Sequence, residues 1–222
     1  MEKDQEIEKN LEIKEMFRTA MILAGGKSSR MGFDKQLLEL DHKTLAVRMA
    51  EELLNHFERV IVVTKTPELY ENVDVMTCSD IYPGQGPISG IHAAFCQSDA
   101  EVLFVVACDM TGFSKAYALH QAERMIEEKT EACVTMNGEK MEPFHGFFSR
   151  SLLPDLEQRL TDPQAPKSLY QLLKNHAVTE IDIEEMRKYA DPEGIFTNLN
   201  TPQDYQAFQA NHCCTPLSDN LN

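Results

Sequence analysis

The amino-acid sequence predicts a single-domain α/β fold, in which a mainly parallel, Rossmann-like sheet carries helices on both faces. Short apolar segments typical of buried strands alternate along the chain with amphipathic segments typical of helices. The chain has 222 residues, which is long enough for one sizeable domain. Because ligands of such sheets lie outside the carboxyl ends of the strands, we expect the functional residues in the loops that follow strands.

The first half of the chain repeats a pattern of strand, loop and helix. The β-branched run Val-Ile-Val-Val-Thr at residues 60–64 is the clearest strand. Gly86-Pro87 is typical of a helix start, and Ser114 is a good N-cap. The expected strands of this half lie at residues 19–24, 60–64, 73–78 and 102–107. The expected helices cover residues 43–56, 88–96 and 115–128.

The second half predicts a hairpin followed by shorter elements. Asn137-Gly138 is typical of a tight turn between two strands. Pro163 and Pro166 separate two helical stretches, and Thr201-Pro202 is typical of an N-cap followed by proline at the first helical position. The expected strands lie at residues 132–136, 144–148, 178–183 and 195–199, and the expected helices cover 151–160, 168–176 and a last segment that starts at residue 201.

Charge and composition narrow the classes of function. A net charge of −15 and a pI of about 4.8 argue against nonspecific binding of DNA or RNA, which requires a basic face. No apolar run approaches the roughly 20 residues of a membrane helix, and residues 1–16 lack the apolar core of a secretory signal. The six cysteines form no CxxC pair, which predicts reduced thiols in a cytoplasmic protein rather than a zinc site.

The pattern divides the chain into three segments. Residues 1–18 form an acidic extension in which Glu and Lys alternate around a few apolar residues, which predicts a surface helix outside the core fold. Residues 19–212 form the predicted domain. Residues 213–222 lack periodicity, which predicts a disordered tail.

The most informative segment is residues 19–35, Thr-Ala-Met-Ile-Leu-Ala-Gly-Gly-Lys-Ser-Ser-Arg-Met-Gly-Phe-Asp-Lys. The apolar run ends at Gly25-Gly26, whose backbone N–H groups are unhindered, and Lys27, Arg30 and Lys35 add positive charge to an acidic protein. A plain turn would explain the two glycines but not the three cations. We therefore expect this loop, the glycine loop of residues 25–35, to hold a polyphosphate.

Two common phosphate-binding motifs do not fit this loop. A Walker A loop would need a glycine at the place of Met21, and the spacing of a dinucleotide fingerprint is missing after Gly25. The segment Leu-Ala-Gly-Gly-x-Ser-x-Arg-Met-Gly-x-Asp-Lys instead resembles the first loop of nucleotidyltransferases that activate sugars or cofactors. Within that group it is most similar to the molybdenum cofactor guanylyltransferase family. The resemblance implies a fold of the nucleotide-diphospho-sugar transferase type.

Later elements extend the resemblance to about residue 208. They are Asp80 with Gly86-Pro87-Ile88-Ser89-Gly90, Cys108-Asp109, Glu142-Pro143-Phe144-His145-Gly146, and Asn198-Leu199-Asn200-Thr201-Pro202. The sequence also departs from the family in two places. The family commonly has a proline soon after its metal-binding aspartate, where Met110-Thr111-Gly112 stands here, and an asparagine after the second strand, where Thr64 and Lys65 stand.

The resemblance implies a set of site residues whose roles have a physical rationale. In nucleotidyl transfer a phosphate oxygen attacks the α-phosphorus and pyrophosphate leaves, so the enzyme needs cations and positioning more than a nucleophile of its own. Arg30 and Lys35 would offset charge on the α-phosphate and the leaving oxygen, and Asp109 would hold Mg²⁺. The implied GTP-binding residues are Leu23, Ala24, Gly25, Gly26, Lys27, Lys35, Asp80, Gly86 and Asp109, and Asn198 and Asn200 are candidates for contact with the second substrate.

Several of these residues also have ordinary structural interpretations. Asp109 would suit a helix N-cap, and Asp80 would suit a turn. Asn198 and Asn200 would suit capping before Thr-Pro. His145 lies near an apolar strand and is expected to be a packed core histidine rather than a catalyst.

The function implied by the resemblance is transfer of GMP from GTP to a molybdopterin-type molybdenum cofactor, with Mg²⁺ as cofactor and pyrophosphate as product. Molybdoenzyme apoproteins or other cofactor-assembly proteins are the implied partners. Related cytidylyltransferases have Leu-Ala-Ala-Gly in the first loop and lack Gly-Pro-x-x-Gly, so residues 23–26 and 86–90 favour guanine. A cytidylyltransferase, a sugar-phosphate nucleotidyltransferase and a noncatalytic nucleotide-binding chaperone remain as alternatives. The presence of Arg30, Lys35 and Asp109 together favours an enzyme.

Overall fold

The core of the protein is a seven-stranded sheet. The computed structural model describes residues 2–24, 39–40 and 43–197. The sheet strands are β1 (Thr19–Leu23), β4 (Arg59–Val63), β5 (Met76–Cys78), β6 (Val102–Ala107), β7 (Ala132–Asn137), β8 (Lys140–Ser149) and β9 (Val178–Asp182). They are ordered β5-β4-β1-β6-β8-β7-β9, and β8 runs antiparallel to its two neighbours while the other pairs are parallel. The predicted α/β fold with a mainly parallel sheet is confirmed.

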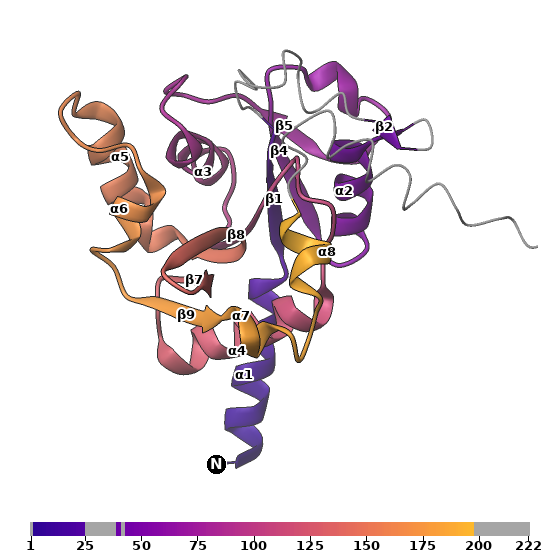
Figure 1. Ribbon diagram of the computed structural model, residues 1–222, viewed down its shortest axis with the longest axis vertical. Helices are drawn as coiled ribbons and strands as arrows, with labels where there is room; N and C mark the ends of the chain where they lie inside the picture. Colours follow the sequence, from indigo (N-terminus) through magenta and orange to yellow (C-terminus); the bar gives the residue numbers. More distant parts are fainter. Residues whose placement is uncertain (1, 25–38, 41–42, 198–222) are drawn as a thin grey trace, which may run out of the picture.

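Helices cover both faces of this sheet (Figure 1). The helices on one face are α3 (Pro87–Cys96), α5 (Leu153–Thr161) and α6 (Leu169–Leu173), and those on the other are α1 (Glu2–Met16), α2 (Leu45–Leu54), α4 (Lys115–Glu128) and α8 (Pro192–Phe196). Successive residues of a strand point to opposite faces, so Met21 packs with α3 and Ile22 packs with α2 and α4. Short elements complete the fold: β2 (Glu39–Leu40) and β3 (Lys43–Thr44), which pair with each other, η2 (Pro67–Tyr70), η3 (Arg150–Leu152) and α7 (Ile183–Met186).

Local signals fix several helix and turn positions, and those at Ser114 and Gly138 were expected. Ser114 caps α4, because its hydroxyl accepts a hydrogen bond from the Tyr117 N–H at 3.2 Å. Thr44 caps α2 in the same way, through the Val47 N–H. Gly138, at the turn between β7 and β8, has a φ of +59°, which glycine adopts without strain.

The prediction of a strand at residues 195–199 is wrong for residues 195–197, which are the part of it that the structure describes. Residues 192–196 form α8 instead, because the Asp191 side chain accepts a hydrogen bond from the Glu193 N–H and Pro192 occupies the first turn. Asp-Pro-Glu is thus a helix start that outweighs the apolar pair Ile195-Phe196. The helix expected from residue 201 and the tail at 213–222 lie outside the described residues.

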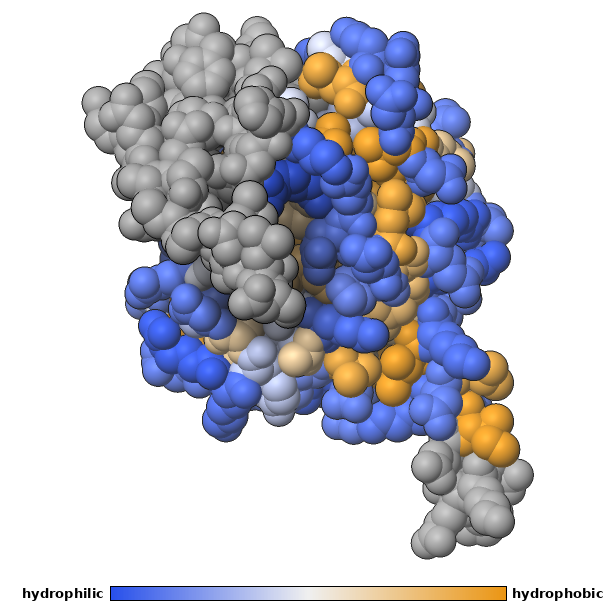
Figure 2. Space-filling view, turned by 90° about the vertical axis from the view of Figure 1, so that its right-hand side faces the viewer, coloured by the Kyte–Doolittle hydropathy of each residue, from blue (hydrophilic) through white to orange (hydrophobic). Residues whose placement is uncertain are grey.

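The predicted surface helix at the N-terminus is α1, which projects from the body of the protein (Figures 1 and 2). Its last turn does not stay outside the core as expected. Met16 is buried, and the ring of Phe17 stacks on Phe57 with centroids 5.2 Å apart. Lys9 also pairs with Glu127 of α4 at 2.9 Å. These contacts join the end of the extension to the domain that follows it.

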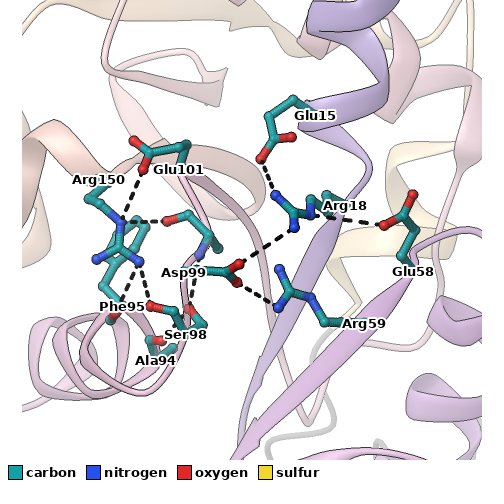
Figure 3. Close-up of polar contacts among 11 residues, drawn as sticks. Glu15, Arg18, Glu58, Arg59, Ala94, Phe95, Ser98, Asp99, Glu101 and Arg150 are labelled. Atoms are coloured by element: carbon teal, nitrogen blue, oxygen red, sulfur yellow. Dashed lines mark hydrogen bonds and ion pairs between the residues drawn. The ribbon is translucent and has the colours of Figure 1, made fainter.

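A charged network fastens the amino ends of three sheet strands (Figure 3). Arg18 precedes β1, Arg59 begins β4, and both guanidinium groups reach Asp99 before β6, at 3.5 and 2.6 Å. Arg18 also contacts Glu15 and Glu58. The hydrogen bond from Arg59 holds the pKa of Asp99 below its usual range. The cations at this edge are therefore engaged with carboxylates.

The composition predicted that the chain has no membrane-spanning helix and that its cysteines are reduced thiols. Within the described ranges, none of the helices is long and apolar enough to cross a membrane. Cys78, Cys96, Cys108 and Cys133 are free thiols, and the last two are buried.

Candidate functional site

The carboxyl ends of four neighbouring strands form one continuous row. Each of three residues that follow a strand donates its backbone N–H to the last residue of the next strand. Ala24 donates to the end of β4 (2.9 Å), Thr64 to the end of β5 (2.8 Å) and Cys108 to the end of β1 (3.0 Å). The row brings the start of the glycine loop to the same edge as Asp80, which follows β5, and Asp109, which follows β6.

The structure describes part of the predicted site. Leu23, Ala24, Asp80, Gly86 and Asp109 are described and lie at or beside this edge. Gly25, Gly26, Lys27, Arg30, Lys35, Asn198 and Asn200 lie outside the described residues. The binding roles of both groups stay predictions.

Asp80 and Leu23 both lie against the first turns of α3. A Cβ built on Gly90 would stand 2.3 Å from the Leu23 Cδ2 and 3.7 Å from the Asp80 Oδ1. Burial raises the pKa of the Asp80 carboxyl, while a hydrogen bond with Ser89 and the charge of Lys65 act in the opposite direction. Asp80 is therefore half-buried beside the helix, with a positive charge nearby.

Gly86 determines how α3 begins. It is the N-cap residue with a φ of +75° and a ψ of −164°, a conformation in which any side chain would be strained. Pro87 then supplies the first helical position, where the missing N–H costs no hydrogen bond. The Gly-Pro pair therefore turns the chain sharply from the Asp80 loop into the helix.

Asp109 starts the loop that joins β6 to α4. The first turn of this loop is fixed by a hydrogen bond from the Met110 N–H to the Ala107 carbonyl at 3.1 Å. Ser114, and not Asp109, caps α4. Asp109 is half-buried at the end of its strand, so the N-cap interpretation of this carboxylate does not apply.

His145 is a packed core histidine, as expected. It is fully buried, its Nε2 accepts a hydrogen bond from the Ser114 N–H at 3.1 Å, and its Nδ1 lies 3.2 Å from the Gln121 Oε1. Gln121 also donates to the His145 carbonyl at 2.8 Å. Burial lowers the pKa of His145 to about 3, so the ring is neutral with its proton on Nδ1. It supports the start of α4 from beneath.

The residues present fit a magnesium ion that is shared with a nucleotide. Within the described part of the chain, no three His, Cys, Asp or Glu side chains gather into a metal site of their own. Mg²⁺ is commonly held by one or two carboxylates together with substrate phosphates. Asp109 at the edge of the sheet would supply such a carboxylate.

Lys65 is a candidate that the sequence pattern did not single out. It is exposed, directly follows the row residue Thr64, and its charge acts on Asp80. Thr64 itself is buried and accepts a hydrogen bond from the Thr66 N–H at 3.0 Å, so it shapes the turn. The signal in the sequence that could have identified Lys65 is its position immediately after the clearest strand, at residues 60–64.

Comparisons with known proteins identify the family of the chain. Residues 20–180 match the family described as MobA-like NTP transferase domain. The chain is 37% identical over 205 residues to the probable molybdenum cofactor guanylyltransferase of Peptoclostridium acidaminophilum, which covers 90% of this chain and 92% of that protein. It is 34% identical over 193 residues to the molybdenum cofactor guanylyltransferase of Syntrophotalea carbinolica, with 87% and 91% covered.

A solved structure shows the shared fold. Molybdopterin-guanine dinucleotide biosynthesis protein A from Archaeoglobus fulgidus superimposes with a TM-score of 0.75 at 22% identity, over 86% of this chain and 97% of that one. The family match and the two relatives show that the chain belongs to the MobA-like NTP transferase family.

Proposed function

We propose that this protein transfers GMP from GTP to the phosphate of a molybdopterin-type cofactor and releases pyrophosphate. The observation that carries the proposal is the row of strand ends, which gathers the glycine-loop start at Ala24, the carboxylate of Asp109 and the Asp80 loop at one edge of the sheet. The two relatives named as molybdenum cofactor guanylyltransferases support the choice of nucleotide and acceptor.

Asp80 is the residue we assign to the base. Guanine presents a ring N–H and an exocyclic amino group side by side, and a carboxylate has two oxygens that accept both. Cytosine offers an amino group without a neighbouring ring N–H. Burial raises the pKa of Asp80, and the hydrogen bond with Ser89 and the charge of Lys65 offset part of this rise, in the direction of the ionised form that accepts such bonds.

The phosphate end of the site rests on the glycine loop and Asp109. The backbone N–H groups of residues 25–27 would hold the β- and γ-phosphates, and Arg30 and Lys35 would offset charge on the α-phosphate and on the leaving oxygen. Asp109 would hold Mg²⁺, which when bound neutralises part of the triphosphate charge. The rest of the rate acceleration would come from positioning of the acceptor phosphate in line with the leaving group.

The proposal includes the acceptor side and the cellular setting. Asn198 and Asn200 are the residues we assign to the molybdopterin cofactor. Molybdoenzyme apoproteins or other cofactor-assembly proteins would receive the product in the cytoplasm. A noncatalytic carrier of the nucleotide would bind GTP without releasing pyrophosphate.

A nucleotide panel tests the function. GTP, CTP, ATP and UTP are each supplied with Mg²⁺ and molybdenum cofactor, and pyrophosphate release is followed. We expect release with GTP. Equal rates with all four would exclude guanine selection, preference for CTP would favour the cytidylyltransferase, and binding without release would favour the carrier.

A matched pair of variants tests the base contact. Asp80→Asn replaces one acceptor oxygen by an amino donor, which would face the donors of guanine, so we expect kcat/KM for GTP to fall by on the order of 100-fold. Asp74→Asn makes the same change at an exposed carboxylate before β5 and serves as the control. Equal effects of the two changes would show that Asp80 does not read the base.

A further inference from the structure

The loop that carries Asp80 is tied to its surroundings at both ends. This Asp80 loop, residues 79–86, joins β5 to α3. At its start the Ser79 hydroxyl donates a hydrogen bond to the Thr64 carbonyl at 3.0 Å. Near its end the side-chain amide of Gln85 donates to a carbonyl of α5 at 3.3 Å. The ends of the loop are therefore fixed by the row of strand ends and by α5.

Ser89 holds the middle of the loop from the first turn of α3. It is fully buried, and its hydroxyl donates a hydrogen bond to the Tyr82 carbonyl at 2.7 Å. A serine inside a helix commonly gives its hydroxyl hydrogen to a carbonyl in the preceding turn of the same helix. Here the acceptor lies seven residues earlier and belongs to the loop. The hydroxyl thus joins the helix to the loop.

The same serine lies beside the carboxylate of Asp80. The side chains of Asp80 and Ser89 hydrogen-bond with each other, and a Cβ built on the next residue, Gly90, would stand 3.7 Å from the Asp80 Oδ1. The single hydrogen of the hydroxyl serves one acceptor at a time, either the Tyr82 carbonyl or the Asp80 carboxylate. Either bond holds the loop against the first turn of α3.

The orientation of the Asp80 carboxylate decides how many donors of a base it can accept. Guanine presents a ring N–H and an exocyclic amino group side by side, and the two carboxylate oxygens have to face them together. Hypoxanthine keeps the ring N–H and lacks the amino group, so it offers one donor at this edge. A rotated carboxylate would lose the second contact, and with it the difference between the two bases.

We propose that Ser89 is a positioning residue that holds the Asp80 carboxylate in the orientation for two-point contact with guanine. The inference rests on the proposed function, in which Asp80 reads the base. Ser89 acts through Asp80 and its loop, and not by contact with the nucleotide. Its effect is therefore on the choice of base, rather than on the affinity for nucleotides in general.

Equilibrium binding of GTP and of inosine triphosphate (ITP) to the full-length protein, with Mg²⁺ present, tests the inference. ITP carries hypoxanthine, so the ratio of the two Kd values measures the second contact. Ser89→Ala removes the hydroxyl, and Ser89→Cys keeps a weaker donor at the same place. Ser98→Ala is the matched control, since the Ser98 hydroxyl donates to the Ala94 carbonyl at 2.8 Å, at the other end of α3.

We expect the wild type to bind GTP on the order of 10- to 100-fold more tightly than ITP, the effect of one hydrogen bond to a charged group. Ser89→Ala should lower this ratio by about three- to tenfold, and Ser89→Cys should lower it less. Ser98→Ala should change it by less than about twofold. In an Asp80→Asn protein, adding Ser89→Ala should also change the ratio by less than about twofold, because the carboxylate that it positions is gone.

Several results would overturn the proposal. One is a Ser89→Ala protein with the wild-type ratio. Another is equal weakening of GTP and ITP binding, which would show that the serine only supports the helix. An undiminished effect of Ser89→Ala in the Asp80→Asn protein, or the same effect in Ser98→Ala, would overturn it as well. If Ser89→Ala does not fold, Ser89→Cys decides, because a weaker donor still has to lower the ratio.

The inference and the proposed function fail in different ways. A wild type that binds GTP and ITP equally would overturn the base contact of Asp80, and with it the role of Ser89. A preference for GTP that is lost in Asp80→Asn and kept in Ser89→Ala would overturn the role of Ser89 alone. Binding needs no turnover, so the test decides the role of Ser89 even if the protein releases no pyrophosphate.

Discussion

The substitution His145→Asn tests whether a neutral, buried imidazole supports the loop behind Asp109. His145 has a φ of +58°, a conformation that asparagine adopts more readily than most residues, so the backbone tolerates the change. The variant loses the acceptor for the Ser114 N–H and leaves no titrating group at this place. The informative quantity is the change of stability with pH, rather than stability at a single pH.

The magnitude follows from the two protonation states. An unfolded histidine has a pKa of about 6.5, whereas burial lowers that of native His145 to about 3. Because the native pKa is the lower one, the unfolded state takes up the proton first, and stability present above about pH 6.5 is lost as the pH falls toward 3. A pH of 5 lies about 1.5 units below the pKa of the unfolded histidine. Protonation of the unfolded state therefore lowers the free energy of unfolding by about 2 kcal/mol at this pH. The figure holds for any native pKa well below 5.

Urea unfolding at pH 7 and pH 5 measures this difference. We expect the free energy of unfolding of the wild type to fall between the two pH values by about 2 kcal/mol more than that of His145→Asn. Tyr117→Phe is the matched control, since it removes the 2.6 Å hydrogen bond to Thr135 in the same cluster without removing a group that titrates in this range. If His145→Asn kept the full pH dependence of the wild type, the native histidine would not be neutral and the assignment would be refuted.

The remaining predictions concern the edge of the sheet. Asp109→Asn should lower kcat by on the order of 100-fold at saturating Mg²⁺, and full turnover would remove the metal role from this residue. Lys35→Ala should lower turnover more than affinity for GTP, measured by steady-state kinetics beside equilibrium binding, and unchanged turnover would count against its action in the transition state. Gly86→Ala should cost about 1–2 kcal/mol of stability and weaken GTP binding, whereas Gly84→Ala, with a φ of +80°, should cost a similar amount of stability and leave GTP affinity intact.

The strands and most helices were predictable because their signals are local. Residues 60–63 and 102–107 are β-branched or apolar throughout, as strands buried on both faces require. The Ser114 and Gly86-Pro87 signals act within one turn of the helices they start. Residues 195–199 were misassigned because two apolar residues were given more weight than the Asp191 cap that precedes them.

The site was predictable only to the extent that topology determines it. Parallel strands deliver their carboxyl ends to one edge, so Ala24, where the glycine loop starts, and Asp109 lie at the same edge whatever the conformation of the loops between the strands. The Thr111 hydrogen bonds to Gly194 and Thr197 join positions more than 80 residues apart and depend on how α8 packs, which no local pattern encodes. The effect of Lys65 on Asp80 likewise depends on the pairing of β4 with β5.

An acidic protein can bind a triphosphate, as we propose for this chain, because salt screens charges over a short distance. At physiological salt the screening length is about 8 Å, so most of the net charge of −15 is screened from a ligand at one edge of the sheet. The arginines at the amino ends of β1 and β4 are engaged with Asp99 and its neighbours. Attraction for phosphate therefore has to come from cations near the carboxyl edge. Lys65 is one of them in the described part of the chain, and Lys27, Arg30 and Lys35 are the cations that we predict for the glycine loop. The loop is where a small change of charge should alter binding most, although it contributes little to the total charge of the protein.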